Sequence, residues 1–161
     1  MAVPTFMRGR VTNWYLWLKV LHVLAASVWF GAAVAILAIM TRLSPTMQRE
    51  RLAALVGACD VIGSRVIAPA GVLTIVVGIA AAWVGRTGMV LWISWGLGAA
   101  VLVLAIGGSA LRLGFARLAK GLESSTSDAG SVAAAVSRLR ALGAVVIAVM
   151  VTAVAVMVLK P

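Results

Sequence analysis

The chain has 161 residues, of which 63% are hydrophobic and 11% are charged, and its formal net charge is +10. Globular domains contain about 45–50% apolar and about 25% charged residues, so this composition excludes an ordinary soluble domain and predicts an all-α integral membrane four-helix bundle, with residues 1–161 as one transmembrane domain. A nucleic-acid binder gathers Lys and Arg on a soluble face, whereas here they lie between apolar runs, so the expected partner is the lipid bilayer and not nucleic acid.

The first predicted span covers about residues 14–40, long enough for a tilted helix. Its apolar stretch exceeds the roughly 7–15 residues of a signal peptide, so we expect an uncleaved anchor. Residues 48–65 are mildly amphipathic and are expected to lie near the membrane interface. The second span covers about residues 66–84, with Pro69 in its first turns, where proline is tolerated or produces a kink.

The third predicted span covers about residues 89–113 and the fourth about residues 139–159. The segment 117–131 between them is the one clearly polar loop. Small residues recur in the second and third spans and would allow close helix packing, either within the bundle or in a homo-oligomer or larger membrane complex.

Most basic residues lie in or next to two of the connections between spans. Loop one joins the first and second spans and includes residues 48–65, and loop three joins the third and fourth spans. These basic residues are Arg42, Arg49, Arg51, Arg65, Arg112, Arg117, Lys120, Arg138 and Arg140. The opposite side holds Arg8, Arg10, Arg86 and Lys160. The positive-inside rule then places both termini outside and loops one and three in the cytoplasm of a bacterial-type inner (plasma) membrane.

A polar and aromatic stripe runs along the first span. Tyr15, Lys19, His22, Ala26 and Trp29 follow a 4-3-4-3 spacing that puts them on one helical face. Ionisable groups within a span are costly and usually face the bundle interior, so the stripe is the candidate functional site. Lys19 is close enough to the helix start to extend toward the headgroups instead.

His22 lies about 12 Å below the start of the span. An imidazole at this depth could ligate haem iron or copper, bind a quinone oxygen, or only hydrogen-bond a neighbouring helix. No second histidine exists in the chain, so a metal at His22 needs another ligand or one from a partner. Met150 in the fourth span lies at a similar depth and is the candidate second ligand; Thr74 in the second span is at a comparable depth.

Other chemistry lacks the residues to perform it. The sequence has no HExxH, GxSxG or P-loop motif and no paired carboxylates on one span. Cys59 is the only cysteine, which excludes an intrachain disulfide and a cysteine-ligated metal centre.

The run YLWLKVLH at residues 15–22, followed by Trp29, resembles the first helix of the HemJ-type membrane protoporphyrinogen oxidases. The segment LHVLAASVWFGA at residues 21–32 is similar to the equivalent helix of CopD-type copper-resistance membrane proteins and of small uncharacterised four-helix relatives, which fit the length best. The HemJ resemblance implies that His22 binds haem b with Lys19 involved, and the CopD resemblance implies copper movement across the membrane.

The resemblance ends after the first helix. The chain continues as AVAILAIM where a HemJ-like protein has a leucine-proline-arginine stretch, and a later lysine-asparagine-glutamate-proline motif is missing, which argues against the oxidase activity. The leading hypothesis is a protein that binds haem b or a similar redox cofactor through His22, with Tyr15, Lys19, Trp29 and Met150 at the site, in electron transfer or haem handling. The alternatives are a CopD-like copper-handling protein and a cofactor-free accessory subunit of a larger membrane complex.

Overall fold

The computed structural model describes residues 5–42, 47–86, 90–124 and 128–159, and these are almost entirely helical. In chain order the elements are α1 (Thr5–Arg42), α2 (Arg49–Ile62), the π-helical turn η1 (Gly63–Ile67), α3 (Ala68–Val84), α4 (Leu91–Ile106), the π-helical turn η2 (Gly107–Leu111), α5 (Arg112–Glu123) and α6 (Ala129–Leu159).

Four of the described helical stretches are long and apolar enough to cross a membrane: Asn13–Arg42, Arg49–Val84, Leu91–Glu123 and Ala129–Leu159. The second joins α2, η1 and α3, and the third joins α4, η2 and α5. The chain is therefore an all-α, multi-pass membrane protein with a four-helix bundle, as the composition predicted.

The helices extend further than the predicted spans. Residues 48–65, expected as a separate interfacial approach, form α2 and most of η1, in line with α3. The expected loop 117–131 is shorter, because α5 extends to Glu123 and α6 begins at Ala129. Leu118 and Leu122 explain the longer α5, since both are buried in the cluster that also contains Leu52 and Val56 of α2.

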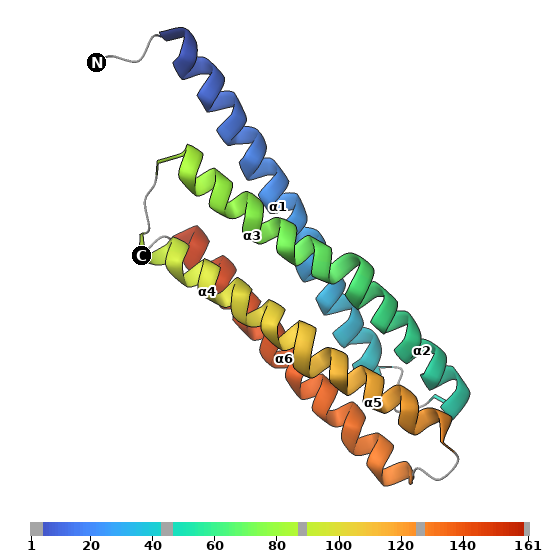
Figure 1. The fold of residues 1–161 in the computed structure, drawn as a ribbon. Coiled ribbons are helices and arrows are strands. Elements are labelled where there is room, and N and C mark those ends of the chain that lie inside the picture. Colours follow the sequence, from blue (N-terminus) through green and yellow to red (C-terminus); the bar gives the residue numbers. More distant parts are fainter. Residues whose placement is uncertain (1–4, 43–46, 87–89, 125–127, 160–161) are drawn as a thin grey trace.

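The helices are arranged as two pairs (Figure 1). α1 lies beside α3, and α4 lies beside α6; α2 and α5 meet at the end of the bundle where α1 ends and α6 begins. One buried cluster fills this end and includes Met40, Val56 and Leu139, and a second, near the middle, is formed by Trp29, Val103, Val146 and Met150. Packing is thus densest at one end of the bundle.

Two π-helical turns adjust the middle of the second and third spans. Pro69 cannot donate a backbone hydrogen bond and its ring would collide with the carbonyl four residues earlier. In η1 the Ala68 N–H instead donates to the oxygen of Gly63, five residues back, which changes the register just before the proline. The hydroxyls of Ser64 and Ser109 donate to the oxygens of Asp60 and Ala105, so carbonyls near both π turns gain a donor.

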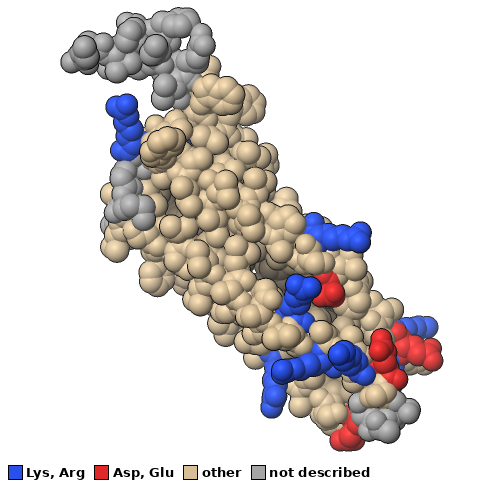
Figure 2. Space-filling model, in the orientation of Figure 1, with Lys and Arg blue, Asp and Glu red and all other residues tan. Residues whose placement is uncertain are grey.

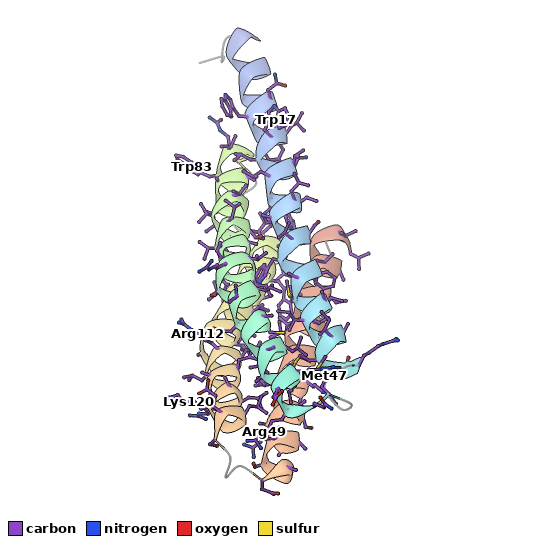
Figure 3. All side chains as sticks on the ribbon, turned by 90° about the vertical axis from the view of Figure 1, so that its right-hand side faces the viewer. Trp17, Met47, Arg49, Trp83, Arg112 and Lys120 are labelled. Atoms are coloured by element: carbon purple, nitrogen blue, oxygen red, sulfur yellow. The ribbon has the colours of Figure 1, made fainter. Side chains whose placement is uncertain are left out.

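Charged side chains gather at the α2/α5 end (Figure 2). The labelled Arg49, Arg112 and Lys120 lie toward that end, and Trp17 and Trp83 lie toward the other (Figure 3). Trp17 and Trp83 are exposed, as expected of an aromatic belt at a membrane surface. The two ends of the bundle therefore differ in charge, with basic residues concentrated at one of them.

Candidate functional site

Three aromatic side chains of α1 pack on two glycines of α3 and on Gly85, the residue directly after it. The Tyr15 ring lies against Gly85, the His22 ring against Gly78 and the Trp29 ring against Gly71. A Cβ atom added at these glycines would come within 2.7 Å of Tyr15 Cε2, 2.8 Å of His22 Cε1 and 2.9 Å of Trp29 Cε2. We call these three pairs the aromatic–glycine ladder.

The ladder follows from sequence spacing. Its members recur every seventh residue in both helices, at positions 15, 22 and 29 and at positions 71, 78 and 85. Two antiparallel helices with matching seven-residue repeats keep the same faces together along their length. Lipid provides no hydrophobic force between helices, so the close contact allowed by glycine, and the van der Waals attraction it permits, hold α1 to α3.

His22 is fixed by a hydrogen bond across the ladder. Its Nδ1 lies 2.8 Å from the backbone oxygen of Thr74 on α3. A carbonyl oxygen can only accept, so Nδ1 carries the proton, and Nε2 is the ring nitrogen with a free lone pair in the neutral imidazole. The Thr74 hydroxyl donates to the oxygen of Ala70 within its own helix. The simplest interpretation of His22, a hydrogen bond to a neighbouring helix, thus accounts for one of its two nitrogens.

The His22 ring lines a large cavity between the two helix pairs. The cavity has a volume of about 1140 Å³ and is lined by residues from all four helical stretches, most of them apolar. Ligand pockets are typically roughly 300–1,000 Å³, lined by apolar and aromatic side chains with a few polar groups. No described residue hydrogen-bonds to His22 Nε2. The cavity is therefore large enough for a sizeable apolar ligand, with one imidazole nitrogen available to it.

The structure brings every predicted site residue to this cavity. Tyr15, Lys19, His22, Trp29 and Met150 all line it. Trp29 and Met150 are 4% and 7% exposed and belong to one buried cluster, so they form its deep end. Lys19 is exposed, and its Nζ lies 4.7 Å from the centroid of the Tyr15 ring, a cation–π contact.

Trp29 also lines a second, smaller cavity of about 280 Å³ toward the α2/α5 end. This cavity adjoins both π turns, at Ser64 and Gly107, and reaches the charged residues Asp60 and Arg112. Trp29 therefore stands between the large cavity and the charged end of the bundle.

Several cavity residues were not singled out from the sequence as site residues. They are Gly78, Arg86, Trp92 and Met157. The seven-residue repeat of glycines in the sequence could have identified Gly78. Nothing in the pattern marks Arg86, Trp92 or Met157, because their position depends on how α4 and α6 face the α1/α3 pair.

The cavity residues fit haem, the group that the sequence resemblance implies. The glycine at position 78 leaves room for the imidazole, the Nδ1 hydrogen bond fixes the ring as such bonds fix metal-bound histidines, and most of the remaining wall is apolar. Met150 and Met157 add thioethers to the same wall. Within the described part of the chain, no three His, Cys, Asp or Glu side chains are grouped as a metal-ion site, so a site built only of such ligands is not present there.

Comparisons with family models, with curated protein sequences and with solved structures find no match for this chain.

Proposed function

We propose that this small membrane protein binds haem b or a similar redox cofactor in the large cavity, through Nε2 of His22, and takes part in electron transfer or haem handling. The observation that carries the proposal is the state of His22: Nδ1 is held by the Thr74 carbonyl while the ring lines an apolar cavity of about 1140 Å³. A histidine needed only for packing requires no such cavity beside it.

The other cavity residues would then act around His22. Gly78 and the Thr74 carbonyl fix the direction of the imidazole, so that Nε2 keeps one orientation in the cavity. Trp29 and Met150 close the deep end against the charged half of the bundle, which keeps the local dielectric low. Met150 is the candidate for a second ligand from this chain. A bound haem would supply one-electron chemistry, with a potential set by ligand identity and burial.

Copper handling is the second candidate. It is supported by the two methionines that line the same cavity as His22, Met150 and Met157, because thioethers and imidazole are ligands that suit Cu(I). The size of the cavity favours haem, since a single ion needs only a small space between converging ligands.

We also propose a bacterial-type inner membrane, with both termini outside and the α2/α5 end in the cytoplasm. The support is the concentration of Arg and Lys at that end, where Arg49, Arg112 and Lys120 lie (Figure 3), and the positive-inside rule. The large cavity, with Lys19 and Arg86, then belongs to the outer half.

The direct test is the visible absorption spectrum of the detergent-purified protein, oxidised and dithionite-reduced, expressed with ample haem. The wild-type chain should show a Soret band and reduced α and β bands, and His22→Ala should lose them. Ser27→Ala is the matched control, because Ser27 lies in α1 on an exposed position and its loss should leave the bands unchanged.

Other outcomes separate the alternatives. A colourless wild-type protein that binds copper in a fixed ratio, with loss in Met150→Leu, would reject haem and support the copper candidate. A colourless protein that binds no copper and purifies stably with a larger membrane complex would reject both and leave a role as an accessory subunit.

A further inference from the structure

We infer that Lys19 and Arg86 form an anion-binding pair at the mouth of the large cavity, and that its ligand is a flat or extended apolar molecule bearing carboxylate groups. This inference rests on the proposed ligand-binding function of the cavity and names the class of ligand it takes.

The cavity has an uneven charge distribution. Lys19 and Arg86 line it, and no acidic side chain does. The chain contains only four acidic residues, Glu50, Asp60, Glu123 and Asp128, and they lie in α2, at the end of α5 and just before α6. Both cations therefore lie in the half of the molecule that has no acidic side chain to pair with them.

Tyr15 contacts both of the segments that carry the two cations. Its ring carries Lys19 Nζ at 4.7 Å from the centroid and packs against the backbone of Gly85, the residue before Arg86. The first pair of the aromatic–glycine ladder thus joins the Lys19 turn of α1 to the end of α3. Both segments line the cavity, and so does the exposed Trp83, which lies toward the same end of the bundle (Figure 3). This is the end that we infer to be the mouth of the cavity.

Arg86 occupies a backbone position that disfavours it. Its φ is 52°, the left-handed region, and among the described residues it is the only non-glycine with positive φ. Its N–H donates to the oxygen of Trp83 at 3.1 Å, in the turn that ends α3. Glycine or asparagine usually takes this place after a helix, and strained residues of this kind cluster at ligand sites. An arginine here, directly after a glycine, indicates that its side chain is needed.

The chemistry of the pair selects the ligand. A guanidinium binds a carboxylate through two parallel hydrogen bonds, and a nearby ammonium adds charge without directional demand. Between these cations and Trp29 the cavity wall is mostly apolar, with His22 and Thr74 as polar members. A ligand that satisfies both regions carries its carboxylates at one edge and an apolar body beyond them.

The test compares metal-free protoporphyrin with its dimethyl ester, which differ only in the charge of the two propionates. Binding is followed by quenching of tryptophan fluorescence in nanodiscs of phosphatidylcholine, since Trp29, Trp83 and Trp92 line the cavity. We expect the wild-type chain to bind the diacid at least about 10-fold more tightly than the ester. Arg86→Gly and Lys19→Met should each reduce this preference, and the double variant should abolish it. Lys120→Met, at the opposite end, should keep it.

Arg86→Gly also separates binding from stability. Glycine suits the left-handed turn, so this variant should melt about 2–4 °C higher than the wild type while losing preference for the diacid. A Tm that falls together with binding would assign Arg86 to helix termination and overturn the inference. Equal binding of diacid and ester, no binding of either, or a preference that survives in the double variant would overturn it as well.

Two further comparisons distinguish a lipid phosphate from the ligand carboxylates, and the anion pair from the haem ligand. If the preference disappears when phosphatidylglycerol is added to the nanodiscs, the pair binds lipid phosphate and the inference is wrong; if it persists, the ligand carboxylates are supported. Metal-free porphyrin carries no iron for His22 to ligate, so its binding tests the anion pair without the proposed haem ligand. The haem proposal can therefore fail, by absence of a Soret band, while the anion pair stands, and the reverse also holds.

Discussion

The His22 ring lies directly on the backbone of Gly78, and a Cβ atom at position 78 would stand 2.8 Å from Cε1 and 3.0 Å from Nδ1. Real Cβ atoms essentially never approach other atoms below 3.0 Å, so the imidazole and a side chain at position 78 exclude one another. The same contact keeps Nδ1 within reach of the Thr74 carbonyl at 2.8 Å. The orientation of the only histidine thus depends on the absence of a side chain one turn beyond Thr74.

Gly78→Ala should therefore displace His22 and weaken binding of the cofactor at least about 10-fold, since a ligand moved by about 1 Å loses its geometry. The measurement is the titration of purified protein with haem, followed at the Soret band. Gly98→Ala is the matched control, because a Cβ at Gly98 meets nothing within 4 Å. Equal affinity in both variants would show that His22 does not hold the cofactor.

Two substitutions of His22 separate its structural hydrogen bond from its role as ligand. The amide nitrogen of asparagine falls close to the position of Nδ1, so His22→Asn can still donate to the Thr74 oxygen but offers nothing at Nε2. His22→Gln places its amide near Nε2 and loses the Nδ1 donor. We expect His22→Asn to keep the wild-type Tm without haem and lose the Soret band, and His22→Gln to lose both, with a stability loss of about 1 kcal/mol.

The result that would contradict this interpretation is a His22→Asn protein that retains its Soret band. In that case another residue ligates the iron and His22 serves helix packing alone. Thermal unfolding without haem, in the same detergent, measures the stability of each variant. The Soret band and the rise in Tm on adding haem measure its haem binding.

The polar stripe of the first span could be predicted because it depends on one helix alone. A 4-3-4-3 spacing places Tyr15, His22 and Trp29 on the same face whatever lies opposite, and the structure brings all three to the cavity. Their partners could not be predicted. Gly71 and Gly78 can be recognised from the sequence only as small residues, because pairing them with Trp29 and His22 requires the register between α1 and α3.

Helix lengths show where local patterns fail. Residues 48–65 have the polarity of an interfacial segment, but their buried side chains Leu52, Val56 and Cys59 pack in one cluster with Leu118 and Leu122 of α5. Tertiary contacts thus extend two spans into continuous helices. The left-handed backbone of Arg86 was equally hidden, since a glycine stands next to it in the sequence and glycine is the usual residue there.

The proposed orientation predicts which residues a membrane-impermeant maleimide reaches in intact cells. In a Cys59→Ala background, Val90→Cys at the start of α4 should be labelled, whereas Glu123→Cys at the end of α5 should be labelled only after permeabilisation. Both positions are exposed in the structure and lie at opposite ends of the third span. Labelling of Glu123→Cys in intact cells would show that the orientation is opposite to the proposed one, with the large cavity in the cytoplasmic half.

Arg49 joins the start of α2 to the end of α5. Its Nε donates to the oxygen of Leu122 at 3.0 Å, and its Nη2 donates to the oxygens of Gly121 and Ser124 at 2.6 and 2.5 Å. The last carbonyls of a helix lack partners within it and carry partial negative charge, so a guanidinium there both satisfies and neutralises them.

Arg49→Ala should lower the free energy of unfolding by about 1–2 kcal/mol, measured by thermal unfolding in detergent. Arg49→Lys should recover only part of the loss, because an ammonium lacks the planar fork that spans several carbonyls. Arg51→Ala removes an equal charge from an exposed position of the same helix and should change stability by less than about 0.5 kcal/mol. An equal loss in the alanine variants of both arginines would trace the effect to net charge and reject the specific role of Arg49.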